Sequence, residues 1–570
     1  MTLLRTFFCL IAAVAAVPAP QADSNTTSPS GASSAAASVC SGNTADDRSV
    51  WCDYSIDTNY YNEVPDTGVT VEYWFDVQNV TLAPDGVERI VLAVNGTVPG
   101  PTIEANWGDT VKIHVTNSLT ANGTGIHWHG IRQNWTNQDD GVPSITQCPI
   151  APGESYTYTW RATQYGTSWY HSHYSLQAWE GVFGPIVIHG PATANYDEEL
   201  DTIMLTDWSH ETADSLYSYA QTVGPPPMEN ALINGKNTYN GGGSRYEATF
   251  QSGTSYRLRI INSAIDSHFK FAIDNHTMTV IASDFVPVEP FEVEYLDITM
   301  GQRYDVIVTA DQEATDYWMR AIPQLACSNN ENPDDVRGIV RYGASTADPT
   351  SIAYAALDND TCVDVAYSNL VPHVSSSPVD PTADSDLDVT IVAQGNLFKW
   401  QIGLTPMAVE WAEPSVLTVY NSNGTSSFED DDVVYELPNA NEWVYFVIST
   451  ALAVPHPIHL HGHDFYILAQ QDNAVFDSSV SLNLDNPPRR DVANLPVGGY
   501  LVIAFLTDNP GAWLMHCHIG WHTSEGLALQ FVERQSEISA LLNSTTLQDT
   551  CSAWNTWAES TGIEEEDSGV

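Results

Sequence analysis

Residues 516–527 of the chain read HCHIGWHTSEGL, and this stretch determines how the rest of the sequence is interpreted. Its first three residues are a His-x-His pair with Cys517 at the centre. Three more pairs have the same spacing: His127-Trp128-His129, His171-Ser172-His173 and His459-Leu460-His461. Residues i and i+2 of a β-strand point to the same face, so each pair presents two imidazoles to one space. Imidazole is a common metal ligand, so four pairs among 17 histidines predict a site for several metal ions rather than solvated or core histidines.

A second metal centre is predicted beside the first. His456 lies three residues before His459, and His522 lies five residues after Cys517. One thiolate and two imidazoles in a trigonal arrangement form a blue-copper electron-transfer centre, and His456, Cys517 and His522 fit this set. Leu527 stands ten residues beyond Cys517, where such centres have an axial ligand, and leucine cannot bind copper. Loss of an axial thioether favours Cu(I), so we expect a fairly oxidising centre.

The two centres are adjacent in sequence. Cys517 is covalently flanked by His516 and His518, which belong to the predicted eight-imidazole cluster, so an electron captured at the blue copper has a short bonded route to that cluster. Together these motifs resemble those of the multicopper oxidases, most closely the ascomycete laccases, from about Cys40 to Val570. The resemblance implies an enzyme with four copper ions that oxidises phenols and aromatic amines by one electron and reduces dioxygen to water.

The resemblance also divides the ligands among the ions. It implies a type 1 copper on His456, Cys517 and His522, a type 2 copper on His127 and His459, and a type 3 pair on His129, His171 and His518 and on His173, His461 and His516. Asp140, in the segment DDGVP, matches the carboxylate that laccases place near the type 2 ion, which makes it a candidate proton relay. Without the resemblance it would be interpreted as part of an Asp-Gly turn.

The substrate is expected at the edge of the type 1 centre, where His522 can expose its ring. Glu229 in MENALINGK corresponds to the carboxylate that laccases use to accept the phenolic proton. Trp521 and Val454 resemble apolar walls of that pocket, although a tryptophan there could equally belong to the core. Glu525 departs from the family, which usually has glycines after this histidine; its carboxylate could lower the copper potential unless it turns to solvent.

An all-β fold is expected. Runs such as TVKIHVTN, YRLRIIN, YDVIVTA and YLVIAFLTD recur with Gly, Pro and Asn between them. HWHG recurs as HLHG and HSH as HCH, so two homologous β-domains are expected to bracket a third that carries no ligands. The architecture implied is three consecutive cupredoxin-like domains, at 40–190, 191–370 and 371–570. The first and third would hold the trinuclear cluster, the second would contribute to the substrate pocket, and the third would hold the type 1 copper.

The N-terminus indicates secretion. Residues 1–19 contain Arg5, an apolar stretch and small residues, which together are typical of a signal peptide, and 20–39 are expected to be a propeptide or disordered tail. No later run is long enough to span a bilayer. We therefore expect an extracellular monomer. Secretion would permit glycosylation at the nine sequons, which start at Asn25, Asn79, Asn95, Asn122, Asn134, Asn275, Asn359, Asn423 and Asn543.

Six of the eight cysteines are expected to pair, because Cys9 leaves with the signal and Cys517 binds copper. The sequence alone allows about 15 pairings. Similarity to ascomycete laccases selects Cys40 with Cys52, Cys148 with Cys551, and Cys327 with Cys362. The resemblance also predicts that the final residues enter the solvent channel of the trinuclear site as a plug: Asp567, Ser568, Gly569 and Val570.

The net charge of −52 argues against nucleic acid as a partner and favours solubility at acidic extracellular pH. Two alternatives to a laccase stay open. A secreted metallo-oxidase for Fe(II) or Mn(II) would use the same coppers and differ in the acidic residues around His522; fungal ferroxidases usually carry a C-terminal membrane anchor, which is not expected here. A non-catalytic copper carrier would not need eight histidines. The sequence leaves the natural substrate open among lignin fragments, melanin precursors and plant phenolics.

Overall fold

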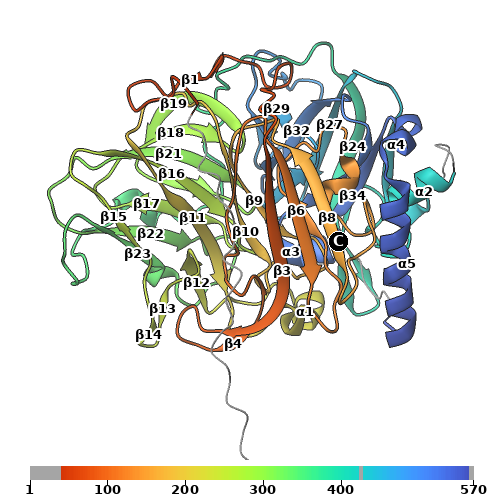
Figure 1. Ribbon diagram of the computed structural model, residues 1–570, viewed down its shortest axis with the longest axis horizontal. Helices are drawn as coiled ribbons and strands as arrows, with labels where there is room; N and C mark the ends of the chain where they lie inside the picture. The colour runs from red at the N-terminus through yellow and green to blue at the C-terminus, as the bar shows by residue number, and fades with distance from the viewer. Residues whose placement is uncertain (1–39, 423–427, 564–570) are drawn as a thin grey trace, which may run out of the picture.

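The computed structural model describes residues 40–422 and 428–563. Six sheets of four or more strands pair into three consecutive sandwiches, which lie side by side (Figure 1). The prediction of an all-β fold is confirmed. Within the described residues, five α-helices accompany the sheets: α1 (Ala213–Thr222), α2 (Ser415–Asn421), α3 (Gly520–Ser524), α4 (Gln535–Leu541) and α5 (Ser544–Thr561).

The first sandwich spans residues 70–189 and packs two four-stranded sheets around one apolar core. In β6 buried residues alternate with half-buried ones, so Val111, Ile113 and Val115 point into the core, as the period of two in TVKIHVTN predicts. The first sheet has the order β4-β3-β6-β8, with β3 (Thr70–Leu82), β4 (Arg89–Val94), β6 (Thr110–Asn117) and β8 (Ser155–Arg161). The second has the order β5-β10-β9-β7, with β5 (Ile103–Asn106), β7 (Ile126–Trp128), β9 (Gly166–Ser172) and β10 (Phe183–His189). The small strands β1 (Val50–Trp51) and β2 (Tyr54–Ser55) precede it.

The second sandwich spans residues 198–341 and contains two of the predicted strand segments, YRLRIIN in β16 and YDVIVTA in β21. Its six-stranded sheet has the order β12-β11-β16-β21-β18-β19, with β11 (Glu198–Trp208), β12 (Asn230–Ile233), β16 (Ser255–Asn262), β18 (Met278–Ser283), β19 (Val286–Val293) and β21 (Arg303–Thr309). Its five-stranded sheet has the order β15-β23-β22-β17-β20, with β15 (Glu247–Thr249), β17 (Phe269–Ile273), β20 (Leu296–Ile298), β22 (Tyr317–Pro323) and β23 (Arg337–Arg341). A hairpin of β13 (Thr238–Tyr239) and β14 (Gly242–Gly243) projects from it.

The third sandwich spans residues 382–533, and its strand β32 contains the first seven residues, YLVIAFL, of the predicted segment YLVIAFLTD. One sheet has the order β25-β24-β27-β32-β29-β30, with β24 (Thr382–Gln394), β25 (Leu397–Ile402), β27 (Trp443–Thr450), β29 (Phe465–Gln471), β30 (Arg489–Arg490) and β32 (Tyr500–Leu506). The other has the order β26-β34-β33-β28-β31, with β26 (Val434–Leu437), β28 (His456–Leu460), β31 (Val492–Leu495), β33 (Gly511–Cys517) and β34 (Ala528–Glu533).

The three sandwiches share one topology. In each, a long first strand pairs antiparallel with a neighbouring strand and parallel with a later one, as β3 does with β4 and β6. The same arrangement recurs in β11 with β12 and β16 and in β24 with β25 and β27. The repeat seen in the histidine motifs of the outer sandwiches therefore extends to the second, which carries none of the eight His-x-His histidines.

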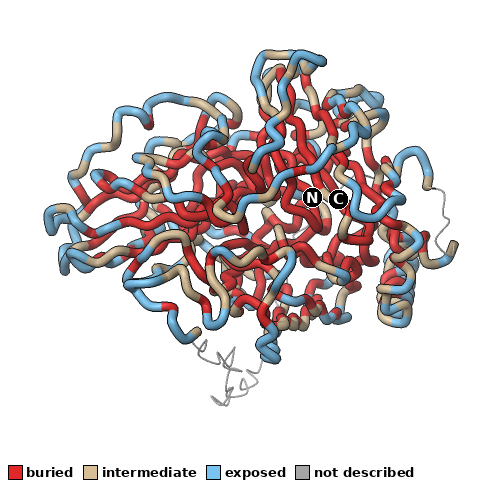
Figure 2. The backbone as a smooth tube through the Cα atoms, turned by 90° about the horizontal axis from the view of Figure 1, so that it is seen from above, coloured by how far each residue is buried: buried red, intermediate tan, exposed pale blue. Residues whose placement is uncertain are grey.

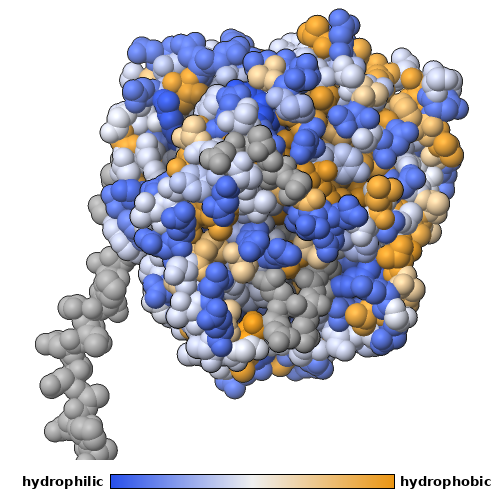
Figure 3. Space-filling model, turned by 90° about the vertical axis from the view of Figure 1, so that its right-hand side faces the viewer, coloured by the Kyte–Doolittle hydropathy of each residue, from blue (hydrophilic) through white to orange (hydrophobic). Residues whose placement is uncertain are grey.

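The burial pattern explains where a site can form. Strands are buried through the interior of the molecule, whereas the exposed residues lie mainly in loops at its periphery (Figure 2). Both β9 and β33 are buried at every position, so their polar side chains must be satisfied inside the protein. The side that carries α5 is hydrophilic over much of its area, in keeping with the acidic composition (Figure 3).

Three disulfides lie in the part of the chain that the structure describes, and they are the pairs that the resemblance implied: Cys40–Cys52, Cys148–Cys551 and Cys327–Cys362. The second joins the first sandwich to α5 across 403 residues of sequence, which ties the end of the chain back to its beginning. Within the described part of the chain, none of the helices has the length and apolar character that a bilayer span requires.

Candidate metal centres

Strand pairing brings the four His-x-His motifs together. In the first sandwich His127 on β7 lies directly opposite His171 on β9, and in the third His459 on β28 lies opposite His516 on β33. The second histidine of each motif is the residue that follows the end of its strand. Antiparallel register thus gathers four imidazoles at one edge of each sandwich.

The two groups of four face each other across the boundary between the first and third sandwiches. The rings of His127 and His461 stack with centroids 3.9 Å apart, and those of His129 and His459 with centroids 3.8 Å apart. The exposed fraction of each of the eight residues is 4% or less. The structure therefore forms one closed cluster of eight imidazoles.

Hydrogen bonds to one nitrogen of a ring decide which nitrogen is left to bind a metal. Nδ1 of His127 lies 2.9 Å from the carbonyl oxygen of Asp140, and Nδ1 of His459 lies 2.8 Å from that of Asp491. A carbonyl only accepts, so Nδ1 carries the proton and Nε2 keeps its lone pair. His129 is reversed, because its Nε2 lies 3.2 Å from the Asp491 carboxylate.

The remaining ring nitrogens indicate metal binding. Several of these buried nitrogens have no hydrogen-bond partner among the described residues: Nε2 of His127, His171 and His459, Nδ1 of His129, and both nitrogens of His173 and His518. Nε2 of His461 and Nε2 of His516 lie 3.3 Å apart, an arrangement in which a shared cation would relieve the repulsion of their lone pairs. Buried polar atoms without partners are costly, and imidazole suits copper, so this donor set fits copper ions.

The protonation state of the cluster also favours a metal. Burial lowers the pKa of His516 to about 4, and burial together with the neighbouring imidazoles lowers the pKa of His129, His171 and His461 well below the usual value. These imidazoles are therefore neutral at neutral and mildly acidic pH, and their lone pairs are available to a cation.

Donor atoms approach one another in groups that agree only partly with the predicted assignment. The predicted trio His173, His461 and His516 is one such group. The predicted trio His129, His171 and His518 is not, although its ring centroids lie 5.1 to 5.7 Å apart. The other groups within the cluster are His127 with His129 and His171, His127 with His459 and His461, and His129 with His459 and Asp491. How the ligands divide among the ions stays a prediction.

The second centre lies in the third sandwich. Cys517 Sγ lies 3.8 Å from Nδ1 of His456 and 3.7 Å from Nδ1 of His522, and all three residues are buried. The buried side chain of Leu527 belongs to the same core, and its carbonyl accepts the N–H of Cys517. Burial raises the pKa of the Cys517 thiol and lowers that of His456 to about 3, so a thiolate here requires a bound cation. These donors fit a thiolate–imidazole copper site.

His522 differs from the expectation of an exposed ring. Its exposed fraction is only 3%, because the indole of Trp400 on β25 lies against it with centroids 3.9 Å apart. The same indole meets His456 edge-on with centroids 5.0 Å apart. Sequence reasoning missed Trp400, which lies 122 positions before His522 in the chain and has no motif around it.

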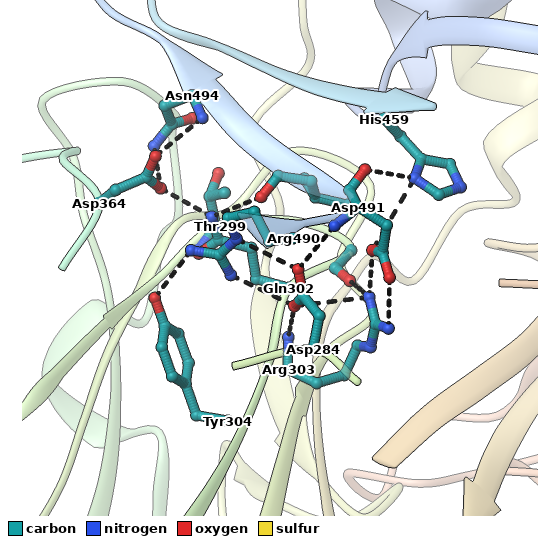
Figure 4. A network of polar contacts seen from close by, with 12 residues as sticks. Asp284, Thr299, Gln302, Arg303, Tyr304, Asp364, His459, Arg490, Asp491 and Asn494 are labelled. Carbon is teal, nitrogen blue, oxygen red and sulfur yellow. Dashed lines mark hydrogen bonds and ion pairs between the residues drawn. The ribbon is translucent and has the colours of Figure 1, made fainter. Parts of the chain in front are cut away.

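Two buried carboxylates orient the histidine cluster. Asp140, which the sequence singled out, lies 2.8 Å from Nδ1 of His461 through Oδ2 and 3.2 Å from Nδ1 of His127 through Oδ1. Asp491, which sequence reasoning missed, contacts His129 and His459 and is bonded by Arg303 (Figure 4). The sequence feature that could have indicated Asp491 is the run Arg489-Arg490-Asp491, in which three charged residues directly precede a buried apolar strand.

The predicted substrate residues differ in how far they are buried. Trp521 is 1% exposed and lines a small cavity of about 20 Å³ together with Met228, the neighbour of Glu229. Glu229 is half-buried and accepts the backbone N–H of His210 at 3.2 Å. Val454 is half-buried in the turn before β28.

Glu525 does not turn to solvent, because it is 3% exposed. The predicted plug, 567–570, lies outside the described residues.

Comparison with known proteins gives one family. Three family models, each described as multicopper oxidase, match residues 76–193, 199–345 and 403–537. The chain is 49% identical to Laccase-2 of Botryotinia fuckeliana over 546 residues, with 93% of each chain covered. It is 40% identical to the laccase of Neurospora crassa, over 93% of this chain and 89% of that one.

Solved structures agree with the sequence relatives. The crystal structure of the laccase from Botrytis aclada superimposes with a TM-score of 0.89 at 48% identity, covering 93% of this chain and all of that one. Fet3p, a multicopper oxidase described as functioning in iron import, superimposes with a TM-score of 0.77 at 28% identity, over 87% of this chain and 96% of that one.

Proposed function

This chain belongs to the multicopper oxidase family and, within it, to the laccase type, and on that premise we propose that it oxidises small phenols and aromatic amines with dioxygen as the acceptor. The observation that carries the proposal is the bonded link between the two centres. Cys517 supplies the thiolate of one donor set, and its chain neighbours His516 and His518 belong to the other.

Bound copper would supply the one-electron chemistry at the Cys517 site and the four-electron reduction of dioxygen at the histidine cluster. The protein supplies the positions. His456, Cys517 and His522 define the site that receives an electron, and Trp400 shields it from water. Asp140 holds the rings of His127 and His461, and its buried carboxylate is our candidate for passing a proton toward the cluster.

Several further features belong to this proposal. We propose four copper ions per chain, divided as the resemblance implies, and a secreted, monomeric glycoprotein released after cleavage of residues 1–19. The domain limits proposed are 40–190, 191–370 and 371–570, and the plug proposed is 567–570. The acidic net charge and the three disulfides support an extracellular protein.

Oxygen uptake measured side by side with a phenol, an aromatic amine and Fe(II) tests the proposed function. A laccase consumes oxygen with the first two donors, whereas a metallo-oxidase prefers Fe(II). Copper binding with no uptake on any donor would instead indicate a copper carrier and would contradict the proposal.

A prediction at Glu229 tests the phenol side. If its carboxylate accepts the phenolic proton, Glu229→Ala and Glu229→Gln should both lower phenol turnover by about ten- to several-hundred-fold. A phenol becomes strongly acidic when it loses an electron, and a nearby base lets the proton leave together with the electron. A non-phenolic one-electron donor should lose far less. Steady-state kinetics on both donors measure this difference.

The glutamine variant separates chemistry from structure. Its amide oxygen can still accept the N–H of His210, as Glu229 does at 3.2 Å, but it cannot act as a base. Full activity in Glu229→Gln with loss only in Glu229→Ala would assign Glu229 to structure. Glu154→Ala, at an exposed carboxylate, serves as the control and should leave both donors unchanged.

A further inference from the structure

The second sandwich carries none of the proposed copper ligands, yet one of its turns reaches the histidine cluster. This turn, residues 299–302, joins β20 to β21, and Arg303 directly after it is the first residue of β21. At Gly301 a Cβ atom would lie 2.8 Å from Cδ2 of the His518 ring, and its φ of +83° is one that other residues rarely adopt. The backbone of the second sandwich therefore packs directly against a proposed ligand of the third.

The next residue ties the turn to the strand that follows Asp491. Nε2 of Gln302 donates to the carbonyl of Val492 at 3.2 Å and to the carboxylate of Asp364 at 2.7 Å. Asp364 in turn accepts the backbone N–H of Asn494 at 2.8 Å. These contacts fix the register of the turn against β31 (Figure 4).

Arg303, directly after the turn, forms two parallel hydrogen bonds with the Asp491 carboxylate. Its Nη2 donates to Oδ2 at 2.6 Å, and its Nη1 donates to Oδ1. Both side chains are buried. The same Asp491 residue contacts His129 through its carboxylate at 3.2 Å and His459 through its carbonyl at 2.8 Å. Asp491 therefore connects the Arg303 guanidinium to a proposed ligand of the first sandwich, His129, and to one of the third, His459.

A second ion pair, between Asp284 and Arg490, supports the Arg303–Asp491 pair. Asp284 accepts the backbone N–H of Arg303 at 2.9 Å and that of Asp491 at 3.2 Å, and it also accepts hydrogen bonds from Nε and Nη2 of Arg490. There is no spare room at the junction, because a Cβ at Gly130 would lie 2.4 Å from Asp491 Oδ2 and 2.5 Å from the Arg303 guanidinium. Gly130 is the glycine of the HWHG motif.

We propose that Arg303 is a positioning residue of the histidine cluster, and that the ligand-free second sandwich aligns the ligands of the other two through its residues 301–303. A bidentate Arg–carboxylate pair fixes the rotation of the carboxylate. The fixed Asp491 accepts the Nε2–H of His129, which turns Nδ1 of that ring toward the metal. The inference rests on the copper-binding function proposed above.

The test is copper loading of the apoprotein, with Arg303→Lys and Arg303→Gln compared with wild type. Competition with a copper chelator should show a loss of affinity at the histidine cluster of about 10- to 100-fold, smaller for lysine, because partners of metal ligands contribute on that scale. The blue absorption of the Cys517 site should be retained, while the paramagnetic signal of the type 2 ion should weaken or change shape. These readouts do not depend on turnover.

Arg259 is the matched control. It is also a fully buried arginine of the second sandwich, and it bonds Thr167 of the first at 2.8 Å and pairs with Asp305 at 3.3 Å, but it contacts none of the eight histidines or Asp491 in the described structure. Arg259→Gln should leave the copper affinity of the cluster unchanged. An equal loss in the Arg259 and Arg303 variants would show a general interface effect and would overturn the inference, as would wild-type affinity in both Arg303 variants.

Gly301→Ala keeps the inference testable if Arg303→Gln does not fold. The added methyl group meets His518 rather than Asp491, so it should weaken cluster loading through the turn itself. Normal loading in Gly301→Ala and Arg303→Lys together would refute the role of the turn. If the wild-type protein itself takes up copper only at Cys517, the proposed function fails first, and that result is distinct from a failure of the Arg303 variants alone.

Discussion

Replacing Cys517 by serine should abolish both the blue absorption and the oxidation of every electron donor, while the fold and much of the copper at the histidine cluster remain. The thiolate supplies the charge-transfer colour and the bonded route to His516 and His518, and a serine hydroxyl supplies neither. The fold should survive because the cysteine forms no disulfide. Absorption spectra, copper content per chain and steady-state oxygen uptake measure the three expectations.

Met515→Leu is a suitable control for this variant. Met515 lies two residues before Cys517 on β33, is equally buried and points to the same face of the strand. A volume-conserving exchange there should cost less than about 1.5 kcal/mol of stability and should leave the colour intact. Phenol turnover by Cys517→Ser in the absence of blue copper would contradict the proposed electron route.

Replacing Asp140 should impair the oxygen side of the reaction and leave the substrate side intact. Its carboxylate lies 2.8 Å from Nδ1 of His461 and 3.2 Å from Nδ1 of His127, so an asparagine would place an N–H₂ group against at least one N–H donor. We expect Asp140→Asn and Asp140→Ala to lower dioxygen turnover by about 10- to 100-fold. Anaerobic bleaching of the blue absorption by a phenol should proceed at the wild-type rate.

Asp139 offers the adjacent control. Burial raises the pKa of Asp139 to about 7. Its carboxylate, however, lies near Tyr156 and the N–H of Thr159 rather than near the histidines. Asp139→Asn should therefore leave reoxidation by dioxygen unchanged. Unimpaired reoxidation in Asp140→Asn would show that Asp140 neither orients the ligands nor carries protons, and slow bleaching would show that it acts on the substrate side instead.

The donor residues themselves could be predicted from the sequence because their geometry is local. A His-x-His pair on a strand presents both rings to one face whatever the rest of the chain does, and covalent adjacency places Cys517 between two cluster histidines. The alternation of TVKIHVTN likewise predicts a half-buried strand, because a period of two matches the pleat. The all-β class followed from the same local rule.

The residues that orient those donors could not be predicted in this way, because each comes from a distant part of the chain. Arg303 and Asp491 are 188 positions apart, and Asp140 and His461 are 321 positions apart. Trp400 reaches His522 only because an edge strand of one sheet passes over α3. Side chains of this kind carry no spacing signal, since their partners are chosen by how the sandwiches pack.

The sequence alone indicated which residues can bind metal and that two donor sets are covalently joined, because both depend on strand periodicity and chain connectivity. Only the tertiary structure decided which nitrogen faces the cluster in His127, His129, His459 and His461. That choice depends on the hydrogen bonds of Asp140 and Asp491, and therefore on how distant segments of the chain meet at one boundary. The tertiary structure also decided that His522 is covered, because the indole that covers it belongs to Trp400 on β25, an edge strand distant from α3 in sequence.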